Sequence, residues 1–305
     1  MVKINYNSDC VRTRDMKLIA LAIPILDQFR RDGYRVTLRQ LHYQFVGKNY
    51  YRNDKSNYGK LCEAMQRGRM AGLIDWDIIE DRTRIVRSRP RWDDPADILN
   101  SCAHCFHVDY WQDQECRVEL WIEKDALIGV IEPACKRWNC SYFSCRGYPS
   151  TSELHEASRR IKRYNERGQV FQILYCGDHD PSGIDMGTNI VRALQDFKTP
   201  CEFKRIALNR DQVERFDLPP NSVKETDSRS KKYRREFGNE CWELDALPPR
   251  ELNMIIGSEI RSCIDDMDAF EERRAEDIEG QEKLRVVADH FDEAHEWAQA
   301  CVQST

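Results

Sequence analysis

The 305-residue chain is 41% hydrophobic and 32% charged, a composition that excludes a disordered protein. No apolar run reaches membrane-spanning length and the first residues do not resemble a signal peptide, so we expect a cytoplasmic protein with no membrane partner. The 13 scattered cysteines favour reduced thiols over a disulfide framework. The net charge of −5 is uneven: residues 1–95 hold 19 Lys/Arg against 12 Asp/Glu, and residues 240–305 hold 6 against 18.

The basic first part predicts three helices and two short strands. Apolar residues at helical spacing mark helices over residues 14–32, from Leu38 and from about Ser56, and Thr37 with Gln40 forms a capping box for the second. Residues 73–79 and 83–87 resemble two strands around a turn. This order predicts an α+β winged helix-turn-helix domain over residues 1–92.

Basic side chains gather on the third helix and on the expected wing of this domain. Such clustering is typical of a surface that contacts the phosphates of double-stranded DNA. The alternative is a small α+β domain with a solvated basic face. The candidate DNA contacts are Lys55, Lys60, Arg67, Arg69 and Arg84.

Arg39 and Tyr43 are four residues apart on the second helix and therefore share one face. A tyrosine hydroxyl beside a guanidinium can attack a phosphodiester, with the arginine stabilising charge on the phosphate oxygens. The alternative is an ordinary half-buried tyrosine. The spacing alone favours that alternative, since tyrosines are common in this stretch.

A linker helix over residues 93–116 precedes a part with alternating strands and helices. Strands are expected over 117–122, 139–145, 170–175 and 202–208, separated by helical runs. This alternation predicts an α/β domain over 117–250, with a parallel sheet flanked by helices, followed by acidic helices over 251–305.

Three carboxylates follow two of these strands. Glu123 comes after the first strand, and Asp178 and Asp180 come after the third. Because parallel strands end at one edge of a sheet, we expect the three carboxylates to meet there and to bind Mg²⁺ through hard oxygen ligands. The alternative for the Asp pair is a polar turn, since Pro181 and Gly183 follow it.

These segments resemble a known family. The stretches Glu123-Lys124-Asp125-Ala126, Gly147-Tyr148-Pro149 and Gly177 to Asp185 (Gly-Asp-His-Asp-Pro-Ser-Gly-Ile-Asp) resemble the Toprim domain of the topoisomerase VI A subunit and of the related meiotic double-strand-break transesterase. In that family a winged-helix domain with an Arg-x-x-Tyr-Tyr motif comes first. Arg39 to Tyr43 matches this motif except that His42 replaces the first tyrosine.

The resemblance implies a type IIB topoisomerase-like transesterase that cuts duplex DNA through a tyrosine–DNA link. Tyr43 would be the nucleophile, Arg39 its helper, and Glu123, Asp178 and Asp180 the Mg²⁺ ligands. It also implies a homodimer in which the tyrosine of one subunit works with the metal site of its partner. A B-type ATPase subunit is a further candidate partner, although the chain is similar to stand-alone mini-A homologues. The expected location is the cytoplasm, at the nucleoid.

Two other hypotheses stay open from the residues. One is a Toprim nuclease that cuts with metal-activated water and does not need Tyr43. The other is a catalytically silent DNA-binding protein whose acidic site organises a metal or a dimer. The shared helical face of Arg39 and Tyr43 favours the transesterase.

Overall fold

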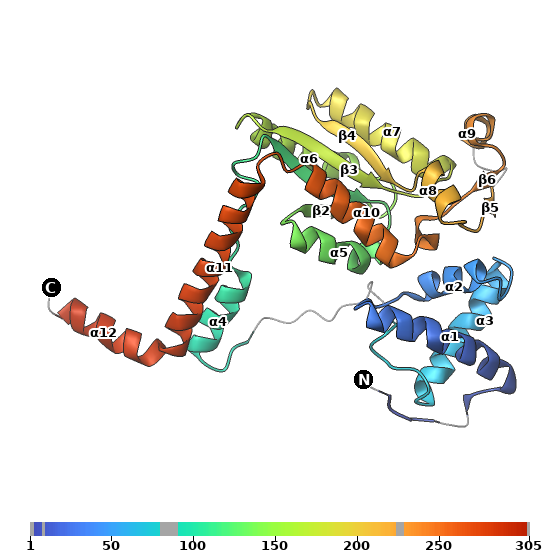
Figure 1. Cartoon of the computed structure of the whole chain (residues 1–305), viewed down its shortest axis with the longest axis horizontal. Helices are drawn as coiled ribbons and strands as arrows, with labels where there is room; N and C mark the ends of the chain where they lie inside the picture. The colour runs from blue at the N-terminus through green and yellow to red at the C-terminus, as the bar shows by residue number, and fades with distance from the viewer. Residues whose placement is uncertain (1–2, 8–9, 80–90, 224–228, 304–305) are drawn as a thin grey trace. The chain divides into compact units, whose positions relative to one another are not determined.

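The computed structural model describes residues 3–7, 10–79, 91–223 and 229–303 (Figure 1). The chain forms two compact units. The first comprises residues 1–84 and 117–263, and the second comprises residues 85–116 and 264–305. The sequence-based division did not anticipate that the linker helix pairs with the acidic C-terminal helices.

A four-stranded parallel sheet forms the centre of the first unit. Its strands are β1 (Cys116–Ile122), β2 (Ser141–Ser144), β3 (Val170–Cys176) and β4 (Glu202–Ala207), in the order β2-β1-β3-β4. The register places Glu119 beside Ser141 and Ile173 beside Phe203. The predicted α/β arrangement with a parallel sheet is therefore confirmed.

Helices cover the sheet. Apolar side chains of α6 (Thr151–Asn165) and α7 (Pro181–Asp196) share a core with the side chains of β3, among them Ile161, Ile190 and Ile173. Helix α10 (Pro249–Ser262) packs against α5 (Ile128–Arg137) and against β4. The remaining short elements of this part are η2 (Asp125–Leu127), α8 (Arg210–Arg215), β5 (Asn221–Ser222), α9 (Ser230–Phe237), β6 (Glu240–Cys241) and η3 (Leu244–Ala246).

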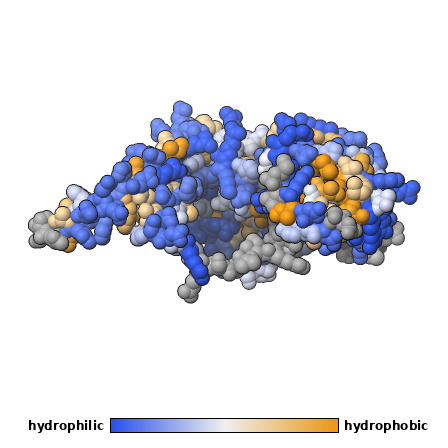
Figure 2. Space-filling view, turned by 90° about the horizontal axis from the view of Figure 1, so that it is seen from below, coloured by the Kyte–Doolittle hydropathy of each residue, from blue (hydrophilic) through white to orange (hydrophobic). Residues whose placement is uncertain are grey.

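The three predicted N-terminal helices are present as α1 (Thr13–Arg31), α2 (Leu38–Gly47) and α3 (Lys55–Met70). The capping box of α2 forms as expected: the Thr37 amide donates to Gln40 Oε1 at 2.8 Å, and the Gln40 amide donates to Thr37 Oγ1 at 3.2 Å. Leu41 and Phe45 of α2 are fully buried between the helices. Figure 2 shows a mostly hydrophilic face with apolar side chains gathered over the N-terminal helices.

The predicted strand over residues 73–79 is wrong. This segment consists of turns, and only Ile79 makes a β-bridge, with Val36. The reason is Asp75, which is buried, accepts a hydrogen bond from the Asp77 amide at 3.0 Å and pairs with Arg30 at 2.9 Å. A side chain that bonds its own backbone two residues on favours a turn over an extended strand. The second predicted wing strand, 83–87, lies outside the described residues.

The second unit contains α4 (Pro95–Cys105), α11 (Met267–Asp289) and α12 (Phe291–Gln303). Helices α4 and α11 pack together along much of their length (Figure 1). The buried carboxylate of Asp277 on α11 accepts hydrogen bonds from the Tyr110 hydroxyl at 2.9 Å and the Val108 amide at 2.7 Å. Among the helices of the described ranges, none is long and apolar enough to cross a bilayer.

Candidate functional site

Tyr43 and Arg39 lie on one face of α2, as their spacing predicts. Tyr43 is 4% exposed, and the Arg39 guanidinium carbon lies 5.8 Å from the centre of its ring. Arg39 itself is half-exposed, so its charged end reaches beyond the buried tyrosine. Tyr43 and Arg39 are therefore neighbours, as the sequence predicts.

Glu243, just before η3, contacts both of them. The Glu243 carboxylate lies close enough to the Tyr43 hydroxyl to shift its pKa, and Arg39 donates hydrogen bonds to the two carboxylate oxygens at 2.9 and 2.7 Å. Glu243 is separated from Tyr43 by 200 residues, and the packing of α2 against η3 brings them together. Glu243 thus places a negative charge next to both Tyr43 and Arg39.

Lys124 extends this network to the sheet edge. Its Nζ lies 3.0 Å from Glu243 Oε2, 2.8 Å from Asp245 Oδ2 and 2.8 Å from Asp178 Oδ1. Asp245 is buried and also lies 3.9 Å from Nε of Arg39. One lysine therefore connects Glu243 with Asp178. Asp178 is one of three carboxylates at the ends of β1 and β3, Glu123, Asp178 and Asp180, which together we call the acidic loop.

The carboxyl ends of β1 and β3 bring the predicted acidic residues together. Glu123 Oε2 accepts a hydrogen bond from the Asp178 amide at 2.9 Å, and Asp178 Oδ1 accepts one from the Leu244 amide at 2.8 Å. Asp180 is the N-cap of α7 and accepts from the Gly183 amide at 2.6 Å. The loop fits closely around these groups: a Cβ on Gly183 would lie 2.2 Å from the Asp178 carbonyl oxygen.

Burial and neighbouring charges shift the pKa values of these groups in different directions. Burial raises the pKa of Asp178 to about 7, although Lys124 opposes this shift. Burial also raises the pKa of Glu123, and the negative charge of Asp180 adds to this shift. Burial also raises the pKa of Glu243, but Lys124, Tyr43 and Arg39 together outweigh it and hold this pKa at about 2.

The pKa of the Tyr43 hydroxyl is raised well above its ordinary value of 10. Burial is the main cause, the Glu243 carboxylate adds to it, and Arg39 opposes it. At neutral pH Tyr43 is therefore a neutral phenol that keeps its proton, and the neighbouring Glu243 is ionised.

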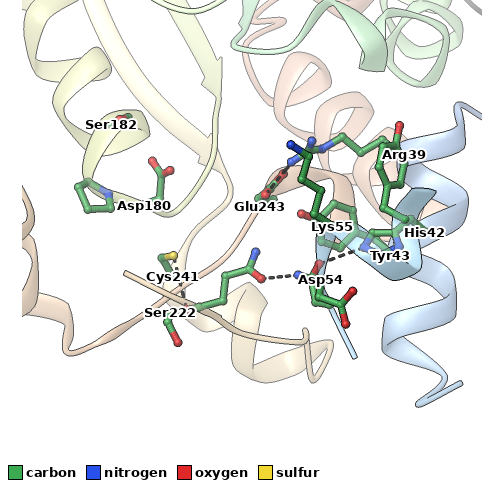
Figure 3. A pocket seen from close by; sticks show the side chains of 14 residues that line it. Arg39, His42, Tyr43, Asp54, Lys55, Asp180, Ser182, Ser222, Cys241 and Glu243 are labelled. Atoms are coloured by element: carbon green, nitrogen blue, oxygen red, sulfur yellow. Dashed lines mark hydrogen bonds and ion pairs between the residues drawn. The ribbon is translucent and has the colours of Figure 1, made fainter. Parts of the chain in front are cut away.

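Tyr43 and Asp180 line a single cavity of about 560 Å³. Figure 3 shows that Arg39, His42 and Tyr43 approach it from the helical side, whereas Asp180 and Ser182 stand on the opposite wall. Ser222 and Cys241, from the antiparallel pair of strands β5 and β6, border it on a third side (Figure 3). The structure thus gathers residues from both predicted domains around one opening.

His42, one residue before Tyr43, lines this cavity. Its Nδ1 lies 3.0 Å from the Tyr51 hydroxyl and its Nε2 lies 3.0 Å from Asn53 Oδ1. The Asn53 amide group in turn donates to Asn221 in β5. His42 thereby connects α2, through Asn53, with strand β5.

The five predicted DNA contacts lie in different settings. Lys55 lines the cavity, and Lys60 is exposed on α3. Arg67 donates to the buried Asp15 at 2.7 and 3.2 Å, and Arg69 donates to the carbonyl oxygens of residues 76 and 79, both at 2.8 Å. These two arginines hold the helical module together, and Arg84 lies outside the described residues.

The acidic loop fits a magnesium ion in its donor chemistry. Each of its three carboxylates keeps one oxygen without a hydrogen bond in the described part of the chain: Glu123 Oε1, Asp178 Oδ2 and Asp180 Oδ2. Across the same ranges, no three His, Cys, Asp or Glu side chains converge closely enough to form a ready-made metal site. Mg²⁺ commonly uses only one or two carboxylates and retains water, so this spacing suits it better than a metal that needs four protein ligands.

Three residues of the network were not predicted as functional: Lys124, Glu243 and Asp245. A signal for them exists in the sequence. Glu243 and Asp245 stand two apart directly after the buried Trp242, the same spacing as Asp178 and Asp180 after β3. Lys124 follows Glu123 at the end of a buried strand, where a cation has acidic neighbours.

The comparisons with known proteins add no family assignment. No protein-family model matches the chain, and a search of curated proteins finds none that is significantly similar.

Proposed function

We propose that this protein is a DNA-binding, Mg²⁺-dependent transesterase of the type IIB topoisomerase kind, which cuts duplex DNA through a covalent link to Tyr43. The observation that carries the proposal is the shared cavity. Tyr43, the expected nucleophile, and Arg39, expected to stabilise charge on the phosphate, line it together with Asp180 from the acidic loop. A transesterase needs both a tyrosine nucleophile and an acidic metal-binding loop, so the presence of both at one cavity supports the proposal.

The reaction exchanges one phosphodiester for another. The Tyr43 oxygen forms a bond to phosphorus, its proton passes to Glu243, the bond from phosphorus to one deoxyribose oxygen breaks, and that oxygen takes a proton from solvent. The link conserves the energy of the original bond, so resealing needs no ATP. Magnesium held by Glu123, Asp178 and Asp180 would supply positive charge beside the scissile backbone.

Arg39 has two roles in this scheme. Its guanidinium stabilises negative charge on the non-bridging phosphate oxygens. A phosphate that takes Arg39 away from Glu243 also removes one of the cations that hold the pKa of Glu243 at about 2. The carboxylate then becomes a better proton acceptor when the substrate arrives.

The proposed partner is double-stranded DNA, and the proposed assembly is a homodimer. One tyrosine cuts one strand, so a double-strand break requires two copies of the site. A B-type ATPase subunit is a further partner that the family resemblance suggests. Work on DNA would place the protein in the cytoplasm, at the nucleoid.

Incubation with supercoiled plasmid and Mg²⁺, followed by a denaturing quench, tests the proposal. We expect wild-type protein to yield linear or nicked DNA that carries protein and to yield none with EDTA. Tyr43→Phe should bind plasmid but form no adduct, whereas Tyr50→Phe, an exposed tyrosine of the same module, should behave as wild type. Cleavage by Tyr43→Phe without an adduct would instead support the nuclease hypothesis, and the absence of any cleavage would support the silent DNA-binding protein.

A further inference from the structure

Helix α9 carries three exposed cations and belongs to the segment that joins β5 to β6 (Figure 1). Asn221 and Ser222 of β5 and Cys241 of β6 line the cavity. Lys231, Lys232 and Arg235 are exposed on α9. None of the three has an ion pair or a hydrogen bond within the residues that the structure describes.

One face of α9 is anchored on the acidic loop. Tyr233 is 3% exposed, and its hydroxyl donates to the His179 carbonyl oxygen at 2.8 Å and lies 2.7 Å from His179 Nδ1. The rings of Phe237 and His179 pack in a T-shaped arrangement, with their centroids 4.9 Å apart. Backbone hydrogen bonds of 2.8 and 2.9 Å between His179 and Trp242 fix the loop to the end of β6.

The helical period places the cations opposite this anchor. At about 100° per residue, residues 231, 232 and 235 span an arc of about 100°, and Tyr233 and Phe237 lie on the far side of the helix. The basic face therefore points away from His179, and its position relative to the loop between Asp178 and Asp180 is fixed through Tyr233.

This arrangement is unfavourable for the helix by itself. The first turn of α9 contains no acidic residue, and Lys231 and Lys232 stand there against the helix dipole. Lys231 and Arg235 are also four residues apart, where like charges destabilise a helix by a few tenths of a kcal/mol. A polyanion bound to this face would remove both costs.

We propose that Lys231, Lys232 and Arg235 form a phosphate-binding face that holds the DNA backbone next to the cavity. The inference rests on the proposed action on DNA, and it moves the main backbone-binding surface from α3 to α9. Arg67 and Arg69 on α3 are engaged inside the helical module, whereas Lys231, Lys232 and Arg235 of α9 have no partner in the described part of the chain.

Binding of a 30-base-pair duplex, measured by fluorescence anisotropy at several salt concentrations, tests this face. For every phosphate that the protein no longer neutralises, the slope of log K against log salt should become shallower by about 0.9. We expect Lys231→Ala/Lys232→Ala/Arg235→Ala to neutralise about two phosphates fewer than wild type and to bind at least tenfold more weakly. The charge-conserving variant Lys231→Arg/Lys232→Arg/Arg235→Lys should bind as wild type.

A matched control removes three other exposed cations. Arg163 on α6, Arg192 on α7 and Arg261 on α10 do not line the cavity, and their triple alanine variant should keep the wild-type slope. An α9 triple variant with unchanged slope and affinity would overturn the inference, even if the Tyr43 adduct still forms. Weakened binding by that variant, with no adduct from wild type, would support the face and refute the proposed reaction. A wild-type protein that binds no duplex would refute both.

Discussion

The Tyr43 hydroxyl lies beside the Glu243 carboxylate, and that carboxylate also pairs with Arg39 and Lys124. Tyr43 and Glu243 come from parts of the chain that the sequence assigns to different domains. Their contact connects the tyrosine module with the acidic sheet edge within one compact unit. It also shows which side chain a DNA phosphate would have to displace from Arg39.

Glu243→Gln should destabilise the protein by about 1–3 kcal/mol at pH 7, because Arg39 and Lys124 lose a partly buried counter-charge. Urea unfolding measures the difference. Glu214→Gln, which removes an exposed carboxylate paired with Arg210, should change the free energy of unfolding by less than about 0.5 kcal/mol. An equal effect of the two substitutions would contradict the network.

The effect of Glu243→Gln should also depend on pH. The folded-state pKa of Glu243 is about 2, below its ordinary value of 4.5, so the ionised carboxylate favours the folded state above pH 4.5. This contribution is lost as pH falls from 4.5 towards 2. The difference between wild type and variant should therefore shrink over that range, and a constant difference would contradict the lowered pKa.

Arg67→Ala should destabilise the helical module by about 3 kcal/mol, because it leaves the buried Asp15 carboxylate without its main partner. Lys60→Ala, on the same helix but exposed, should change stability by less than about 0.5 kcal/mol. Thermal or urea unfolding of both variants checks this. If Arg67→Ala were stable and bound DNA less well, Arg67 would be a DNA contact after all.

Gly183→Ala should disturb the acidic loop, since its Cβ would meet the Asp178 carbonyl oxygen. We expect a destabilisation of about 1–3 kcal/mol, the usual effect of overpacking. Gly59→Ala is the control: nothing lies within 4 Å of its Cβ position on α3, so it should stabilise by about 0.5–1 kcal/mol. A tolerated Gly183→Ala would show that the loop is less closely packed than described.

Mg²⁺ should raise the melting temperature of the wild-type protein and should raise that of Asp178→Asn little or not at all. The reason is that ligand binding to the folded state stabilises it, and the substitution removes one of the proposed ligands. Asp196→Asn, at the exposed end of α7, should respond to Mg²⁺ as wild type does. No response of the wild type to millimolar Mg²⁺ would contradict the proposed metal site.

Mixing Tyr43→Phe with Asp178→Asn asks whether the tyrosine and the acidic loop act within one chain. Tyr43 and Asp180 line one cavity of a single chain, so, in contrast to the shared site that the family resemblance implies, we expect the mixture to form no covalent adduct. Restored adduct formation would show that the tyrosine of one subunit works with the acidic loop of its partner. Each variant alone serves as the control.

Local patterns explain why so much of the fold could be predicted. The apolar period and the Thr37 cap predict α2, and an apolar run interrupted only by Gln172 predicts β3. The meeting of Glu123 with Asp178 follows from a general property of parallel sheets, since β1 and β3 are neighbours and end at one edge.

The remaining features depend on contacts between distant segments. Asp75 favours a turn over a strand within residues 73–79, because Arg30, 45 residues earlier, stabilises its buried charge. Glu243 reaches Tyr43 only because α2 packs on η3, and no periodicity within either segment encodes that contact. For the same reason, the engagement of Arg67 with Asp15 could not be separated from a DNA-facing role.

The most direct test of the central claim is to identify the residue that carries DNA. After reaction with plasmid and Mg²⁺, nuclease digestion would leave a short nucleotide remnant on the protein, and mass spectrometry of the peptides would locate it. We predict the remnant on the peptide that contains Tyr43, and on no peptide of the Tyr43→Phe protein. A remnant on another residue, or cleaved DNA with no remnant on the protein, would contradict the account.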